Sequence, residues 1–289
     1  MRLSAFTSNA AVTSVGHKMS SAAWIDAHYE ACAFEYETML RSIGIQRGWQ
    51  VLDAGCGTGG FLPIISELVG NCGRVAAMDI APEHVDLVRR QSGAGHFMCP
   101  VTAQIGDLLS LPFPDNTFEA VWNANVFQYL SESDQSIALA EFKRVLKPGG
   151  VLAIKDGDIT ALQIAPVPPL ILWRLLNSWA QSDDRQATGM LDSIRIDSRV
   201  KRQGFVNVRR HVTFIERTAP LRCAETQFIA GLIDFFGKLA ANLDHLPPDD
   251  KKYWRLIADA TSSRYVLNDP DLYLREAAVL VLGNKGGSL

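Results

Sequence analysis

Short apolar runs alternate with stretches of helical periodicity through the first half of the chain. The apolar runs predict β-strands at 50–53, 74–79, 101–105, 119–123 and 151–154. Between them, apolar residues recur at the spacing of a helix face near 60–69, 82–92 and 133–146. This alternation predicts an α/β fold in which a parallel sheet is covered by helices on both faces.

Three flanking segments, at 20–43, 170–179 and 228–243, also have helical patterns. The last two carry more apolar surface than a solvent-facing helix needs, so we expect them to form lids over a pocket for a bulky apolar ligand. An alternative is that they pack on one another or form a subunit interface, which leaves a homo-oligomer open. A later apolar run, Ala277 to Leu282, predicts a last strand.

The segment Val51 to Gly60, VLDAGCGTGG, joins the first predicted strand to the first predicted helix. Glycine is needed where the backbone takes positive φ, or where a ligand lies against the main chain. A strand that feeds such a turn predicts a cofactor site. Gly55, Gly57 and Gly60 satisfy the G-x-G-x-x-G spacing of dinucleotide-binding proteins, so an NAD-dependent oxidoreductase is one hypothesis.

Asp53, two residues before the first glycine, favours a different family. Together with three segments in register further along, it resembles the class I S-adenosylmethionine-dependent methyltransferases, in the small-molecule branch of ubiquinone/menaquinone-biosynthesis and sterol C-methyltransferases. The segments are Ile105 to Leu108 (IGDL), Leu111 to Phe118 (LPFPDNTF) and Glu141 to Gly150 (EFKRVLKPGG). The resemblance spans roughly 50–154.

The resemblance implies a Rossmann-like, doubly wound and mostly parallel seven-stranded sheet with a reversed last strand. An N-terminal helix and helical lid insertions would complete the fold. We expect a flexible leader at 1–19 and a single methyltransferase domain at 20–289. Within that domain, 20–46 would be a helical cap, 47–157 the cofactor-binding core, and 158–289 the lid helices, last strands and pocket elements.

The cofactor implied by the resemblance is S-adenosyl-L-methionine. The carboxylate of Asp53 and the backbone of Gly55 and Gly57 are expected at its methionine moiety. Asp79, with Ile80 after it, ends the second strand and is expected at the ribose, where a carboxylate can accept both hydroxyls. Both cofactor hypotheses predict this role for Asp79.

The remaining cofactor positions separate the two hypotheses. By resemblance, Gly106, Asp107 and Leu108 lie at the adenine, and the main chain of Asn123 lies at the amino-acid end of the cofactor. A dinucleotide-binding fold requires no role for Gly106 and Asp107. In such a fold, the position of the KPGG segment relative to the glycine turn would be a coincidence. The sequence therefore favours the methyltransferase hypothesis.

The expected reaction is C- or O-methylation of a small, apolar or bulky metabolite, of the secondary-metabolite type. The protein's main task would be to align acceptor and methyl group. A hydroxyl or an acidic carbon would also benefit from a general base, for which Asp158 and His28 are candidates, and Tyr29 is a candidate pocket residue.

Other chemistries remain open. An alkene acceptor would form a carbocation that aromatic faces stabilise, for example Trp24, Tyr29, Trp173 and Trp179. Members of the family also catalyse cyclisation with the cofactor bound, and a cofactor-binding protein without activity is a further alternative.

The amino-acid composition limits the classes of molecule that the protein is expected to bind. The 289 residues carry a net charge of −3, which gives no electrostatic case for nucleic acid. The five cysteines are odd in number and lack a C-x-x-C pair, so we expect neither disulfides nor a metal site. No apolar run reaches the length of a membrane span, and the N-terminus is a poor secretory signal. These features predict a soluble cytoplasmic enzyme with a small-molecule substrate.

Overall fold

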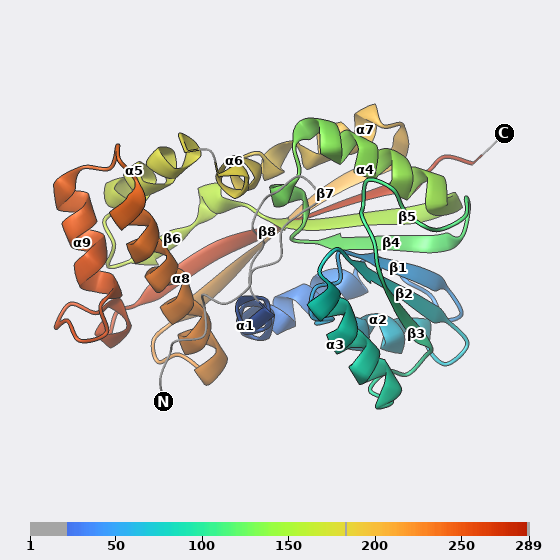
Figure 1. Ribbon diagram of the computed structural model, residues 1–289, viewed down its shortest axis with the longest axis horizontal. Coiled ribbons are helices and arrows are strands. Elements are labelled where there is room, and N and C mark those ends of the chain that lie inside the picture. Colours follow the sequence, from blue (N-terminus) through green and yellow to red (C-terminus); the bar gives the residue numbers. More distant parts are fainter. Residues whose placement is uncertain (1–21, 183, 288–289) are drawn as a thin grey trace.

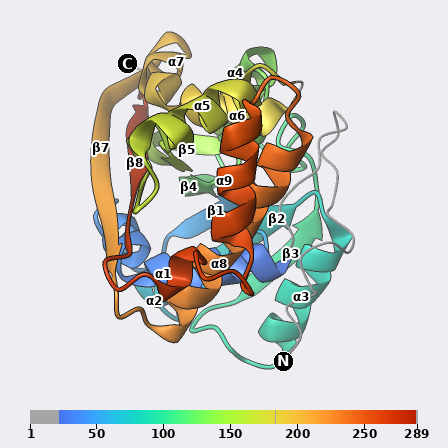
Figure 2. The same cartoon turned by 90° about the vertical axis from the view of Figure 1, so that its left-hand side faces the viewer.

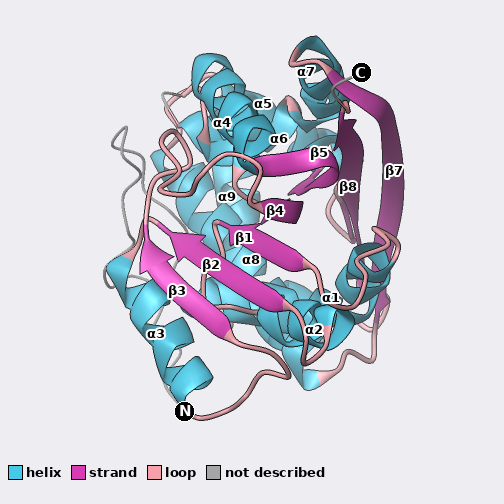
Figure 3. Cartoon of the chain, turned by 90° about the vertical axis from the view of Figure 1, so that its right-hand side faces the viewer, coloured by secondary structure: helices cyan, strands magenta, loops and turns pink. Residues whose placement is uncertain are grey.

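A twisted eight-stranded sheet forms the centre of the computed structural model, which describes residues 22–182 and 184–287. The strand order is β3-β2-β1-β4-β5-β8-β6, and β7 pairs with β8. Figure 3 shows this sheet from β3 at one edge to β7 at the other. Five strands run parallel: β1 (Gln50–Ala54), β2 (Arg74–Asp79), β3 (Val101–Ile105), β4 (Phe118–Ala124) and β5 (Leu146–Gly157). The predicted parallel half of the sheet is confirmed.

The reversed last strand is also confirmed and is longer than predicted. β8 (Tyr273–Lys285) lies between β5 and β7 (Phe205–Thr218) and is antiparallel to both. A short strand, β6 (Gln163–Ala165), pairs antiparallel with the first residues of β8. It is an addition to the seven strands expected, and it forms because β8 extends beyond the end of β5.

Helices cover both faces of the sheet. One layer contains α1 (Ala22–Arg41), α2 (Leu62–Val69) and α3 (Pro82–Gly93), and the other contains α4 (Glu132–Val145) and α7 (Ile196–Arg202). Successive strand residues point to opposite faces. Accordingly Val51 and Trp122 enter the core beside α2, whereas Leu52 and Val121 enter the core beside α4. This alternation explains why the strands read as continuous apolar runs.

The helix before β5 ends within one residue of the predicted boundary at 146, but the strand after it begins earlier than predicted. We expected Pro148 and the two glycines after it to form a stop before a strand at 151–154, whereas α4 ends at Val145 and β5 begins at Leu146, which is extended (φ −69°, ψ 140°). A residue before proline disfavours the helical region, so Lys147 must already be extended. The turn expected at KPGG is therefore part of the strand.

Four helices form a second group at the left of Figure 1, on the far side of the molecule from β1–β3. They are α5 (Pro169–Ala180), α6 (Arg185–Leu191), α8 (Cys223–Asn242) and α9 (Pro248–Ala258). Figure 2 shows α8 and α9 side by side in front of the sheet. The predicted lid segments correspond to α5 and α8. The leader predicted at 1–19 lies outside the described residues, and within the described ranges no helix has the length and apolar character to cross a membrane.

Candidate functional site

A cavity of about 1050 Å³ opens where the parallel strands end. Its floor includes Gly55, Asp79, Ala124 and Gly157, which lie at or just after the carboxyl ends of β1, β2, β4 and β5. The strand order reverses between β1 and β4, and α/β sheets bind their ligands at such a switch point. The opposite walls come from α1, α5, α6 and α8. The cavity is therefore enclosed by the predicted core, cap and lid together.

The glycine turn after β1 has the backbone that the sequence predicted. Gly55, Gly57 and Gly59 have φ values of +82°, +51° and +89°. A Cβ on Gly55 would lie 2.5 Å from the Val126 side chain, so this glycine is required by packing. A Cβ on Gly57 would meet no protein atom nearer than 3.6 Å, and Gly57 lines the cavity. Packing therefore does not exclude a side chain at Gly57, which is placed by its positive φ and by the cavity that its main chain lines.

Asp79 is fixed at the rim of the cavity by its neighbours. Its Oδ2 accepts a hydrogen bond from the Gly57 N–H at 2.8 Å, and its Oδ1 accepts one from the Ala81 N–H at 2.9 Å. His84 Nδ1 lies 3.3 Å from Oδ1. Burial alone would lower the pKa of His84, but the carboxylate raises it. The sequence did not single out His84, although its place on the first turn of the helix after Asp79 was a usable signal.

Asp53 is a buried carboxyl group directly before the glycine turn. It is 1% exposed, and its Oδ2 has no hydrogen-bond partner among the described residues. Burial, together with the charge of Asp79, raises the pKa of Asp53 to about 8. A buried acceptor without a donor is costly, so a donor or a positive charge brought near Asp53 would be stabilising, although Asp53 is not among the residues that line the cavity.

Asn123 joins the two central strands. Its Nδ2 donates to the carbonyl oxygen of Ala54 at 2.6 Å, and its Oδ1 lacks a partner among the residues described. Asn123 is fully buried and does not line the cavity, whereas the next two residues, Ala124 and Asn125, do. The structure therefore places the Asn123 side chain in the sheet, with the following backbone at the cavity.

The expected adenine-binding residues lie beside Asp79 rather than in the cavity wall. The Gly106 N–H donates to the carbonyl oxygen of Asp79 at 3.0 Å, and Asp107 Oδ1 accepts from the Leu109 N–H at 3.0 Å. A Cβ on Gly106 would lie 2.4 Å from the Met78 sulfur, which explains the glycine. Gly106, Asp107, Leu108 and Ile80 are not among the cavity-lining residues.

All three candidate catalytic residues line the cavity. Oδ1 of Asp158 accepts from the Thr160 N–H at 3.0 Å and from its hydroxyl at 2.6 Å, at the start of the short 3₁₀ helix η2 (Ile159–Ala161). The Tyr29 ring packs edge-on against Phe61. Burial, reinforced by Glu37, raises the pKa of Tyr29 above its ordinary value, so this phenol can donate a hydrogen bond but is not a base near neutral pH.

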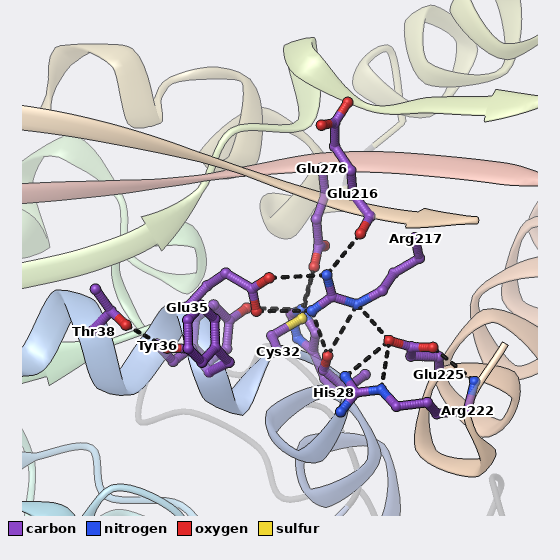
Figure 4. Close-up of polar contacts among 12 residues, drawn as sticks. His28, Cys32, Glu35, Tyr36, Thr38, Glu216, Arg217, Arg222, Glu225 and Glu276 are labelled. Atoms are coloured by element: carbon purple, nitrogen blue, oxygen red, sulfur yellow. Dashed lines mark hydrogen bonds and ion pairs between the residues drawn. The ribbon is translucent and has the colours of Figure 1, made fainter.

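His28 is part of a polar cluster that the sequence did not predict (Figure 4). Its Nε2 lies 2.9 Å from the Tyr36 hydroxyl and 3.3 Å from Glu276 Oε1. The Cys32 thiol donates to the same Glu276 oxygen at 3.0 Å. Glu276 belongs to β8, 248 residues away from His28. The available signal was a lone acid in an otherwise apolar strand, but nothing in the sequence pairs it with His28.

Aromatic rings form the remaining wall. Trp24 packs against Phe228 with 5.3 Å between ring centroids, and Trp179 packs edge-on against Phe235 at 5.5 Å. All four line the cavity, as the lid prediction implied. Trp173, the other tryptophan considered as a pocket residue, is 45% exposed and is not among the lining residues. Trp173 lies outside the buried stripe of α5, to which Trp179 belongs.

Comparison with known proteins gives a consistent set of relatives. Residues 51–150 match the family model described as a methyltransferase domain. The malonyl-[acyl-carrier protein] O-methyltransferase of Serratia marcescens is 39% identical over 136 residues, 46% of this chain and 49% of the relative. A demethylmenaquinone methyltransferase of Deinococcus radiodurans is 31% identical over 158 residues, 49% of this chain and 64% of the relative. The chain thus spans about half of the first relative and less than two thirds of the second.

Solved structures share the fold. The YcgJ protein of Bacillus subtilis is similar with a TM-score of 0.56 at 18% identity, covering 90% of this chain and all of that one. Phosphoethanolamine N-methyltransferase 2 of Haemonchus contortus, in complex with S-adenosyl-L-methionine, is similar with a TM-score of 0.54 at 15% identity. That match covers 92% of this chain and 57% of the other. At these identities the likeness is one of architecture.

Proposed function

Because this chain contains a methyltransferase domain at residues 51–150, we propose that it transfers the methyl group of S-adenosyl-L-methionine to a small metabolite. One observation carries the proposal. A single cavity of about 1050 Å³ joins the glycine turn and Asp79 to His28, Asp158 and the aromatic wall. This volume lies at the upper end of small-molecule sites, which suits a cofactor and an acceptor bound side by side.

Three features of the described residues fit this cofactor. The main chain of Gly57 lines the cavity, Asp53 Oδ2 lacks a donor, and Asp79 Oδ2 has a lone pair beyond the one that the Gly57 N–H uses. We propose that Asp53, Gly55 and Gly57 hold the methionine end, and Asp79 and Ile80 the ribose. Gly106, Asp107 and Leu108, which adjoin Asp79 at the sheet edge, would hold the adenine, and the backbone after Asn123 the amino-acid end.

The bound cofactor would supply a methyl group on a positively charged sulfur. The chain's own contribution is to align the acceptor with that methyl group and to exclude water, because a displacement of this kind is accelerated mainly by position. His28 and Asp158 are the candidates to accept a proton from the acceptor, since both line the cavity. Tyr29 would orient the acceptor as a hydrogen-bond donor.

The acceptor is proposed to be small and largely apolar, methylated at carbon or oxygen, as in secondary metabolism. Trp24, Trp179, Phe228 and Phe235 support this proposal because they leave one wall of the cavity apolar. The two curated relatives carry the names of an O-methyltransferase and of a quinone-precursor methyltransferase, so they favour neither acceptor atom. We also propose a cytoplasmic location, because all five cysteines are unpaired.

A transfer assay tests the function. The protein is incubated with S-adenosylmethionine carrying a labelled methyl group and with a panel of phenols, hydroquinones and acidic-carbon compounds, and the label in organic extracts is measured. We expect label in at least one product, and none with Asp79→Ala. Asp244→Ala, on an exposed turn outside the cavity, is the matched control. Binding of the cofactor with no transfer to any acceptor would instead favour the cyclisation alternative.

A further inference from the structure

One face of α1 presents three polar side chains to β8. His28, Cys32 and Tyr36 are spaced by four residues, so they lie on the same side of the helix. Glu276 reaches them from β8, and both His28 and Glu276 also line the cavity (Figure 4). The cluster is therefore continuous with the proposed acceptor site, although the glycine turn and Asp79 are not part of it.

The contacts of Glu276 determine which nitrogen of His28 carries the proton. Burial alone would raise the pKa of Glu276, but protonated His28, the Cys32 thiol and Lys155 lower it to about 2, and the last two still favour the carboxylate when His28 is neutral. Its Oε1 is 3.3 Å from His28 Nε2. An ionised oxygen at that distance would repel a lone pair, so the hydrogen is assigned to Nε2, where Glu276 Oε1 and the Tyr36 hydroxyl oxygen at 2.9 Å both accept from it. In neutral histidine, the lone pair then lies on Nδ1.

The His28 ring is held in this orientation from its other sides. It stacks on Phe228 with 4.6 Å between centroids and 8° between planes, and the Tyr36 hydroxyl lies 2.9 Å from Nε2. Nδ1 has no hydrogen-bond partner among the described residues, and it is not one of their buried unpartnered atoms. A basic nitrogen without a partner is therefore accessible from the cavity.

The buried ammonium group of Lys155 compensates the negative charge of Glu276. Lys155 is 1% exposed, its Nζ lies 3.6 Å from the Tyr36 ring centroid, and it donates to Asn125 Oδ1 at 2.7 Å. A buried carboxylate with a nearby ammonium group and two hydrogen-bonded neighbours persists where an isolated one would not. Glu276 can therefore orient His28 and also stabilise the imidazolium that forms when His28 accepts a proton.

We propose that Glu276 is the positioning residue for His28, and that the acceptor carries an ionisable O–H or C–H proton at the atom to be methylated. This inference rests on the proposed methyltransferase function and assigns its substrate class. The acceptor proton moves to His28 Nδ1, and the electron pair of the broken O–H or C–H bond forms the new bond to the methyl carbon. The pair of the broken carbon–sulfur bond stays on sulfur. An alkene acceptor would lose its proton only after methyl transfer, from the carbocation, so it would not need a base that takes a proton from the atom to be methylated.

The same cluster has a second conceivable occupant. The ligand atoms of His28, Cys32 and Glu276 lie within 4.8 Å of one another, a spacing that a divalent cation can bridge. Such a cation would need a thiolate and an Nε2 lone pair, whereas burial raises the pKa of Cys32 and the carboxylate requires a proton on Nε2. The buried ammonium group of Lys155 would also repel it. The geometry therefore favours the hydrogen-bonded dyad.

Nitrogen-15 NMR of the histidine rings tests the dyad without any turnover. We expect the Nε2–H tautomer for His28 in the unmodified protein and in Glu276→Asp. In Glu276→Gln the amide can donate to Nε2, so the Nδ1–H tautomer should become populated. Glu216→Gln, on the exposed side of β7, is the matched control and should leave the His28 signals unchanged. An Nδ1–H tautomer in the unmodified protein, or no change in Glu276→Gln, would overturn the proposal.

Binding of two naphthalene probes tests the substrate class. With S-adenosylhomocysteine present, 2-naphthol should lose about tenfold in affinity in Glu276→Gln, because its hydroxyl loses a base, while 2-methylnaphthalene should bind equally to both proteins. Equal losses for the two probes, or zinc binding that displaces 2-naphthol, would contradict the inference. If S-adenosylhomocysteine does not bind the unmodified protein, the proposed methyltransferase function is wrong. The tautomer of His28 is measured without this ligand, so that result would remain valid.

Discussion

The backbone N–H of Gly57 donates a hydrogen bond of 2.8 Å to Oδ2 of Asp79. The glycine turn after β1 and the acid that ends β2 therefore form one structural unit. They meet because β1 and β2 are adjacent parallel strands, with Asp53 paired in register with Ala77. The same contact sets the conformation of the turn at the place where we propose that the cofactor binds.

Replacement of Gly57 by alanine should abolish cofactor binding while the fold is retained. The new Cβ would lie at the wall of the cavity, 3.6 Å from the Ile25 side chain, and the positive φ would cost about 1–2 kcal/mol of folding free energy. Gly44→Ala is the matched control, because Gly44 has φ +84° and a Cβ added there would meet no atom within 4 Å. Calorimetric binding and thermal unfolding of both variants separate the two effects. Retention of full cofactor affinity in Gly57→Ala would place the cofactor elsewhere.

Asp53 should make the stability of the ligand-free protein fall with rising pH. Its pKa is about 8 in the folded protein and 3.8 in the unfolded chain, so between these values the folded state holds a proton that the unfolded state has released. Each pH unit in this window then removes about 1.4 kcal/mol from the free energy of unfolding. Urea unfolding at several pH values measures the slope.

The variant Asp53→Asn isolates this contribution because it cannot ionise. The difference in free energy of unfolding, Asp53→Asn minus the unmodified protein, should increase by about 1.4 kcal/mol per pH unit between pH 5 and pH 7. Other titrating groups act in both proteins and largely cancel in the difference. Parallel pH profiles for the two proteins would show that Asp53 is already ionised in the folded state.

Asp158 can be tested with two substitutions, because it has both a structural and a proposed chemical role. Asp158→Ala removes the acceptor for the Thr160 N–H and hydroxyl, whereas Asp158→Asn keeps an acceptor oxygen but cannot accept a proton. We expect both variants to bind S-adenosylhomocysteine normally. If Asp158 is a base, kcat should fall by about 10²-fold in both. Unchanged turnover in Asp158→Asn would leave His28 as the base.

Arg217 should be important for stability because it anchors α1. Its guanidinium donates to both oxygens of Glu35 at 2.9 and 2.8 Å and lies 3.0 Å from Glu225 on α8. Arg217→Met leaves these two acids without their buried partner, so we expect a loss of about 3 kcal/mol. Arg209→Met, at an exposed position on the same strand, is the control. Equal melting temperatures for the two variants would show that α1 is held by apolar packing alone.

The core from β1 to β5 could be predicted because its signals are local. Each strand is a single apolar run, and the residues that shape the site, such as Gly57 and Asp79, directly follow a strand or end one in the sequence. The parallel pairing then brings them together without further information. The start of β5 was less accurate: the strand begins at Leu146 and not at 151, because the restriction before Pro148 already holds Lys147 extended.

The rest of the site could not be predicted because it depends on contacts between distant segments. His28 and Glu276 meet only because β8 inserts next to β5 and α1 packs across the sheet edge. Either side chain alone has an ordinary alternative, on a helix surface or at a strand end. His84 and Lys155 were missed for the same reason, since their importance lies in what they contact, Asp79 and Tyr36 respectively.

Parallel calorimetric titrations with S-adenosylmethionine, S-adenosylhomocysteine and NADH identify the cofactor of this protein. The cavity, with its glycine turn and Asp79, predicts micromolar binding of both sulfur nucleotides and none of NADH. Asp79→Ala should lose that binding. Binding of NADH alone would contradict the proposed methyltransferase function and would show that the glycine turn binds a dinucleotide.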